Sequence, residues 1–156
     1  IIHSISHAVS AFFDTHHGLN NAIALPRVWA FNMPVMYERY ADMAAAMGVD
    51  THGMTKVQAA DAALEAAIRL LRDVGIVERF ADVKQDSYPK NRLGQGPTKY
   101  YEGRPDITTD AATIDALTNH VLGDACTPGN PKECTFETVR PVVEHCMLGD
   151  LDELLP

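Results

Sequence analysis

The chain has 156 residues, of which 46% are hydrophobic, and its formal net charge is -8. This length suits one domain with a single core, and the apolar content excludes a wholly disordered chain. The acidic balance argues against a nucleic-acid partner or an anionic membrane surface, and no apolar run approaches the roughly 20 residues that span a bilayer.

The first third of the chain has the periodicity of helices. Apolar residues recur at three- and four-residue steps, which predicts a helix over residues 1–13 and, after a break, a second helix over residues 19–31. Asn32 is the expected N-cap of a third helix over residues 33–47. The helical pattern is already running at Ile1 without an initiator Met, so we expect an upstream part of the protein.

Three more helices are predicted further along. Thr55 and Gln58 fit a capping box at the start of a helix that ends at Gly75. Its apolar stripe is expected to include Val57, Ala60, Leu64, Ile68, Leu71 and Val74. Helices over residues 110–122 and 135–147 follow. Because no segment alternates as a strand does, we predict an all-α helical bundle.

Residues 84–106 interrupt this pattern with a loop rich in proline, glycine and tyrosine. A structureless segment of this length is uncommon inside a compact domain. Its backbone groups need water or a partner, so we expect it at the surface or in a subunit contact of a homo-oligomer.

The three cysteines, Cys126, Cys134 and Cys146, are too few and too widely spaced for a disulfide scaffold or a zinc ribbon. An odd number at low density is typical of a reducing compartment, so we expect a cytoplasmic protein. The simplest interpretation of Cys134 and Cys146 is two free thiols.

Four of the seven histidines lie within fifteen residues of the N-terminal region: His3, His7, His16 and His17. His3 and His7 are four apart on a helix and therefore share a face. The break near Asp14 could fold His17 back opposite His3, and three imidazoles could then hold a divalent metal. From spacing alone, a helical histidine is more often an incidental polar residue than a metal ligand, and Asp14 could merely cap.

Two segments resemble the signature of the iron-containing (group III) alcohol dehydrogenases. From His3 to Pro26 the chain follows the family pattern His-x3-His, then His-Gly-x2-Asn-Ala-x2-Leu-Pro, with the same spacing of fourteen between His3 and His17. From Asp124 to Lys132 it follows Asp-x-Cys-x3-Asn-Pro. Ser10 stands where the family usually has glycine, which would tighten packing there. The long loop resembles insertions of the nitrosoaniline-dependent methanol dehydrogenase branch.

This resemblance implies roles for four residues. His3 and His17 would be metal ligands, and His7 would face the reacting centre as a proton relay or as a residue that orients others. Cys126 would line the substrate and nicotinamide pocket. The fold implied is the C-terminal helical domain of a dehydroquinate-synthase-like or iron alcohol dehydrogenase.

The implied activity is hydride transfer between a small primary alcohol, or the matching aldehyde, and NAD or NADP, with Fe²⁺ or Zn²⁺ as Lewis acid. The family's other two metal ligands and its glycine-rich pyrophosphate turn have no counterpart here. We therefore expect residues 1–156 to be a C-terminal metal-binding domain without its N-terminal nucleotide-binding domain, and to be inactive alone. The alternatives are a zinc- or manganese-using relative, such as a polyol dehydrogenase or a dehydroquinate-synthase-like lyase, and a non-enzymatic helical interaction module.

Overall fold

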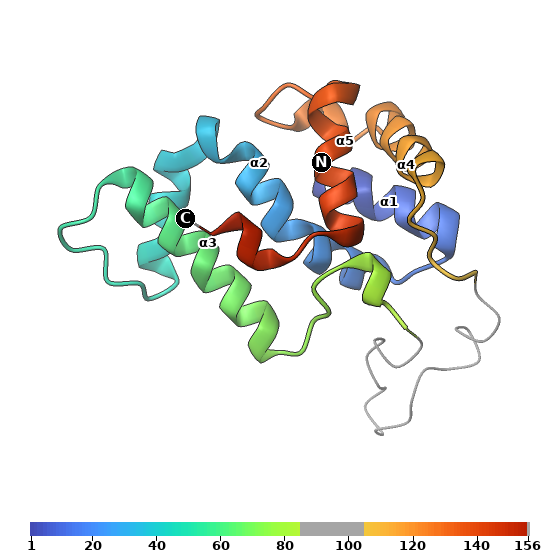
Figure 1. Cartoon of the computed structure of the whole chain (residues 1–156). Helices are drawn as coiled ribbons and strands as arrows, with labels where there is room; N and C mark the ends of the chain where they lie inside the picture. Colours follow the sequence, from blue (N-terminus) through green and yellow to red (C-terminus); the bar gives the residue numbers. More distant parts are fainter. Residues whose placement is uncertain (85–104, 156) are drawn as a thin grey trace.

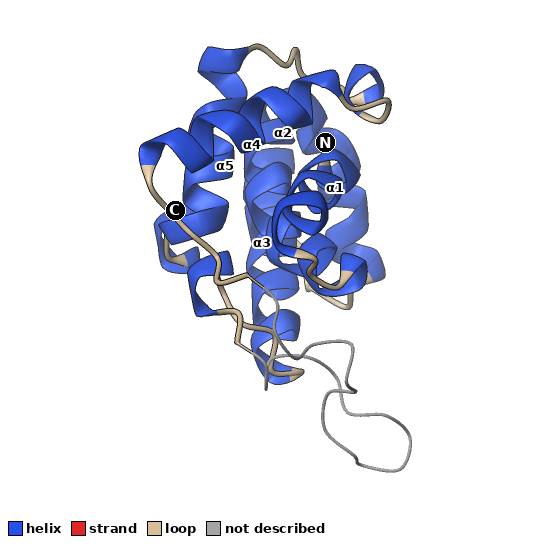
Figure 2. Cartoon of the chain, turned by 90° about the vertical axis from the view of Figure 1, so that its right-hand side faces the viewer, coloured by secondary structure: helices blue, strands red, loops and turns tan. Residues whose placement is uncertain are grey.

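The computed structural model describes residues 1–84 and 105–155, and within these ranges it contains helices and no strand (Figure 2). The long helices are α1 (Ile2–Phe13), α2 (His17–Ala46), α3 (Lys56–Asp73), α4 (Ala111–Gly123) and α5 (Phe136–Leu148). Short 3-10 helices are η1 (Phe80–Asp82), η4 (Thr127–Gly129) and η5 (Leu151–Leu154). The predicted all-α class is confirmed. Most of the predicted loop at residues 84–106 lies outside the described residues.

Helix α2 runs through the middle of the molecule (Figure 1). Its first half buries Leu19, Ile23 and Val28 in a core shared with α1, α4 and α5. Its second half packs against α3. A second hydrophobic cluster forms there, and it includes Trp29 and Ala44 of α2. Helix α2 therefore contributes side chains to both cores and connects them.

The expected third helix, capped by Asn32, does not exist as a separate element. Helix α2 continues from His17 through Asn32 to Ala46. The Asn32 side chain does not cap a helix end, because its amide pairs with that of Asn130 through bonds of 3.0 and 2.8 Å. Pro34 removes one backbone donor. Asn32 before it and Ala41 and Ala44 after it are buried, so packing holds both parts of the helix.

Helix α3 begins where the sequence predicted. The Thr55 hydroxyl accepts the Gln58 amide proton at 3.2 Å, and the Gln58 side chain accepts from the Thr55 amide, which completes the capping box. The predicted apolar stripe was wrong at its ends, since Val57 and Val74 are exposed. The buried face is narrower and is built mainly of alanines, which lets α3 approach α2 closely.

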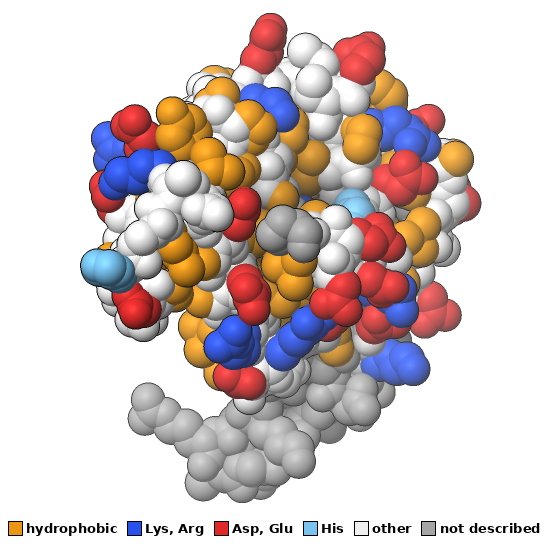
Figure 3. All heavy atoms as spheres, turned by 60° about the vertical axis from the view of Figure 1, so that its left-hand side comes forward, with side chains coloured by type: hydrophobic (Ala, Val, Ile, Leu, Met, Phe, Trp, Pro, Cys, Tyr) orange, Lys and Arg blue, Asp and Glu red, His pale blue; other side chains and the backbone are white. Residues whose placement is uncertain are grey.

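The surface mixes charges of both signs. On the face in Figure 3, Lys and Arg side chains stand beside Asp and Glu. Arg72 pairs with Glu78 and Asp152, and Arg79 pairs with Asp82 and Asp150. Among the helices of the described residues, none combines the length and apolar character needed to cross a bilayer.

Candidate metal centre

Helix α1 carries the first two histidines of the site on its exposed face. Ile5, Ala8 and Val9 on the opposite face are buried and fix the rotation of the helix. His3 and His7 consequently project together, with ring centroids 6.2 Å apart.

A tight turn brings the third histidine back onto these two. Asp14 adopts the left-handed conformation, with φ 52°, and ends α1. The buried Asn20 amide nitrogen lies 3.3 Å from the Ser6 carbonyl oxygen, 2.9 Å from Ser10 Oγ and 2.8 Å from Thr15 Oγ1. These bonds hold the start of α2 against α1, so His17 at the first position of α2 faces the α1 histidines.

The result is a stack of three imidazole rings. His3 Nδ1 and His17 Nε2 are 3.1 Å apart. The His17 ring centroid lies 5.1 Å from that of His3 and 5.3 Å from that of His7. One nitrogen from each ring lies within 4.8 Å of the others. Two nitrogens bound to one tetrahedral ion are roughly 3 to 4 Å apart, so the His3–His17 spacing suits a shared ion.

The electrostatics of this stack favour a neutral His17 ring. Neighbouring atoms remove part of the water around the His17 ring and so lower its pKa, and the imidazoles of His3, His7 and His16 lower it further. A neutral imidazole keeps one lone pair on nitrogen, which is what a metal ligand requires. The donor chemistry of the cluster therefore fits a divalent cation.

His7 has a second partner from far along the chain. Its Nδ1 lies 2.9 Å from Asp124 Oδ2, and Asp124 Oδ1 accepts the Cys126 amide proton at 2.8 Å. The Cys126 amide, followed by the His7 contact, lowers the pKa of Asp124 to about 2. The Asp124 carboxylate is therefore charged near neutral pH and holds a proton on His7 Nδ1.

The segment with Asp124 and Cys126 is attached directly to α1. The Thr127 hydroxyl bonds Ser4 Oγ at 2.8 Å and the Val121 carbonyl at 2.5 Å. This attachment places an exposed Cys126 beside His7 and Asp124, and one ligand-type atom from each of the three lies within 4.8 Å of the others.

The structure thus brings together all four site residues named from the sequence: His3, His7, His17 and Cys126. It also adds Asp124, which sequence reasoning had not assigned to the site. The spacing Asp-x-Cys was a usable signal, because an aspartate often bonds the amide two residues on. His16 is near the cluster in sequence, but its ring caps α2 by accepting from the Leu19 amide at 3.4 Å.

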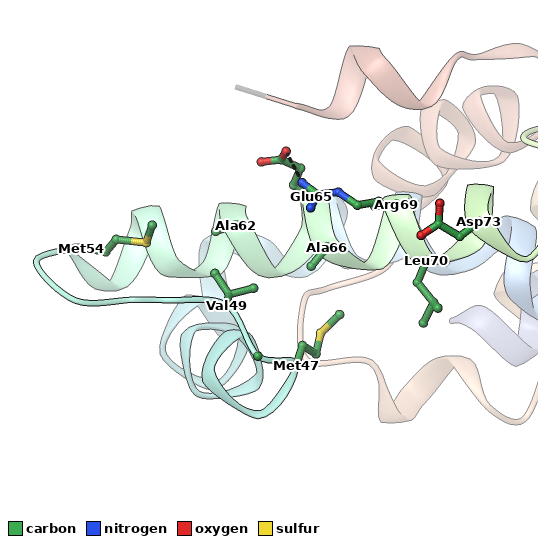
Figure 4. Close-up of a pocket in the computed structure, with 10 residues that line it drawn as sticks. Met47, Val49, Met54, Ala62, Glu65, Ala66, Arg69, Leu70 and Asp73 are labelled. Atoms are coloured by element: carbon green, nitrogen blue, oxygen red, sulfur yellow. Dashed lines mark hydrogen bonds and ion pairs between the residues drawn. The ribbon is translucent and has the colours of Figure 1, made fainter.

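Two hollows in the surface differ in their relation to this centre. One, of about 280 Å³, adjoins it and is lined by His3, Cys126, Val28 and Pro131 among others. The other, of about 440 Å³, lies between the end of α2 and α3, where Met47, Met54 and Leu70 line it (Figure 4). None of the predicted site residues lines this second hollow.

Comparisons with known proteins bear on the chemistry. Residues 1–147 match the family described as Fe-containing alcohol dehydrogenase family, C-terminal. Methanol:N,N-dimethyl-4-nitrosoaniline oxidoreductase of Amycolatopsis methanolica is 81% identical over 155 residues, which are 99% of this chain and 36% of that protein. The enzyme of the same name from Rhodococcus erythropolis is 61% identical over 94% of this chain and 34% of its own length.

A solved structure has the same fold. A 1,3-propanediol oxidoreductase superposes with a TM-score of 0.73 at 23% identity, over 94% of this chain and 32% of that one. The chain therefore spans about a third of the length of the relatives that it matches.

Proposed function

Because the chain belongs to the Fe-containing alcohol dehydrogenase family, we propose that it is the metal-binding helical part of a dehydrogenase that transfers hydride between a small primary alcohol and a nicotinamide cofactor. The family is the one that the histidine and cysteine segments predicted. Membership argues against the alternative of a non-enzymatic interaction module.

The observation that carries this proposal is the 3.1 Å between His3 Nδ1 and His17 Nε2. In our proposal these two atoms are ligands of a divalent ion, Fe²⁺ or Zn²⁺. When bound, such an ion supplies Lewis acidity, which lowers the pKa of an alcohol. Both imidazoles are exposed, so an ion that they held would be accessible from solvent.

His7 is proposed to handle the proton of the alcohol. Oxidation of a primary alcohol to its aldehyde releases the hydroxyl proton as well as a hydride. His7 Nδ1 donates to Asp124, so His7 Nε2 keeps a lone pair that can accept this proton. The charged Asp124 stabilises the resulting imidazolium.

Cys126 is proposed to form a wall of the nicotinamide pocket. Partial loss of water around the sulfur, together with Asp124, raises the pKa of its thiol. The side chain therefore stays uncharged at neutral pH and presents a small, weakly polar surface. This suits contact with a cofactor ring better than nucleophilic chemistry.

The proposal for the full-length enzyme extends to its metal, its cofactor, its cellular location and its assembly. We propose Fe²⁺ before Zn²⁺, NAD or NADP, and a homo-oligomer. The unpaired cysteines Cys126, Cys134 and Cys146 fit a cytoplasmic location. The chain alone is expected to be inactive, because the family's remaining metal ligands and nucleotide-binding turn have no counterpart in its sequence.

Substitution in the full-length enzyme tests the roles. His3→Ala and His17→Ala should each lower bound metal, measured by elemental analysis, and abolish alcohol oxidation. His7→Ala should keep the metal and slow the reaction. His52→Ala is the control, since it removes an exposed imidazole on a distant turn. Full metal content and full activity in His17→Ala would disprove the assignment.

A further inference from the structure

Ser6 is a fully buried polar residue of α1, and among the described residues its side chain bonds only His17. Its hydroxyl oxygen lies 2.8 Å from His17 Nδ1 and 3.0 Å from the His17 carbonyl oxygen. The other two serines of the helix bond elsewhere. Ser4 contacts Thr127, and Ser10 contacts Thr15 and Asn20.

The single hydroxyl proton of Ser6 limits how His17 can be protonated. If that proton goes to the His17 carbonyl, the oxygen can only accept from Nδ1, which must then carry a proton. His17 Nε2, the atom 3.1 Å from His3, then has a lone pair. If the proton went to Nδ1 instead, Nε2 would be protonated and could not bind a metal.

Burial makes this pairing strong. Ser6 has no exposed surface, so no solvent competes for its hydroxyl, and a bond in these surroundings is stronger than one in water. The carbonyl belongs to the same residue as the ring, so one side chain fixes both the backbone and the imidazole of His17. The constraint on ring rotation is thus built into the contact between α1 and α2.

We propose that Ser6 is a positioning residue for the metal site. Its hydroxyl oxygen accepts a hydrogen bond from His17 Nδ1, so the lone pair stays on Nε2 and is directed at the position shared with His3. This proposal rests on the proposed role of His17 as a ligand. Ser6 itself touches neither metal nor substrate.

The test measures metal affinity rather than activity. Zn²⁺ and Fe²⁺ are titrated into the metal-free full-length enzyme against a competing chelator. Ser6→Ala should weaken binding by about 10- to 100-fold, as loss of a partner that orients a histidine ligand usually does. Thr118→Val is the matched control, since it removes an equally buried hydroxyl, on α4, that donates to the Ile114 carbonyl and not to a histidine. It should change the affinity less than about threefold.

Two further measurements separate the possible failures. In metal-free protein with ¹⁵N-labelled histidine, His17 should be protonated on Nδ1, and Ser6→Ala should shift protons to Nε2. An unchanged tautomer, or equal losses of affinity in Ser6→Ala and Thr118→Val, would overturn the proposal. If His17→Ala loses metal while Ser6→Ala binds normally, only the role of Ser6 fails. If His17→Ala keeps its metal, the proposed metal site itself fails.

Discussion

Arg27 is the side chain whose removal should affect the stability of this domain most clearly. It lies in α2 and is only 2% exposed. Its Nη1 donates to the Glu78 carbonyl and its Nη2 to the Gly149 carbonyl, both at 2.6 Å, while its Nε donates to His145 Nδ1 at 3.2 Å. Arg27 therefore joins α2 to the segment before η1 and to the end of α5.

The substitution Arg27→Met keeps most of the apolar stem and removes every donor. Two partly buried carbonyls would lose bonds to a charged group, each worth about 1.5–3 kcal/mol. The cost of burying the charge, which also lowers the pKa of Arg27, would disappear and offset part of this loss. We expect a net destabilisation of about 2–4 kcal/mol, and at 2–4 °C per kcal/mol a fall in Tm of roughly 4–16 °C.

Thermal and urea unfolding, followed by circular dichroism, measure this difference. Arg69→Met is the control, because Arg69 forms an exposed pair with Glu65 on α3. Such pairs contribute about 0–1 kcal/mol, so the control should stay close to the parent protein. An Arg27→Met protein as stable as the control would refute the reasoning, since the carbonyls would then have found other donors.

Two other predictions concern the same corner of the molecule. Gly149→Ala should cost about 1–3 kcal/mol in unfolding experiments, because a Cβ there would overlap the His145 ring, whereas Gly123→Ala, which meets open space, should cost nothing. Burial, followed by Arg27, lowers the pKa of His145. Below the usual histidine pKa of about 6.5, the unfolded chain therefore binds more protons than the folded one, and the free energy of unfolding should fall as the pH drops from about 7.0 to about 5.5. His145→Gln should flatten this slope, and an unchanged slope in that variant would contradict the prediction.

Elements specified by neighbouring residues were predictable from the sequence. The capping box of Thr55 and Gln58 and the Thr135 cap of α5 need only groups three residues apart. The left-handed Asp14 likewise ends α1 where the pattern breaks. In each case the stabilising partner lies within the same helical turn, so the local sequence was sufficient.

The continuation of α2 through Asn32 was not predictable in this way. An asparagine before a proline-containing helix is a good local capping signal. Its actual partner is Asn130, 98 residues away in the chain. A tertiary amide pair replaced the local cap, and no pattern near residue 32 indicates it.

In the candidate site, too, the contacts between residues close in sequence were predictable, and those between distant residues were not. The spacing of His3 and His17 predicted that their rings could meet, because a helix and a short turn determine where both residues lie. The contact of His7 with Asp124 depends on the packing of α4 against α1, which the histidine pattern does not encode. The Ser6 contact was hidden for another reason, since a serine on a buried helical face has no distinctive periodicity.

The two halves of the site differ in how much chain must be ordered to form them. His3 and His17 are separated by 14 residues, whereas His7 and Asp124 are separated by 117. By loop-closure entropy alone, the longer connection costs about 1.9 kcal/mol more to close. A local opening that detaches α4 and η4 would free His7 from its carboxylate and leave the facing pair of imidazoles intact. Proton handling would then be lost at a milder temperature or denaturant concentration than the ability to capture a cation.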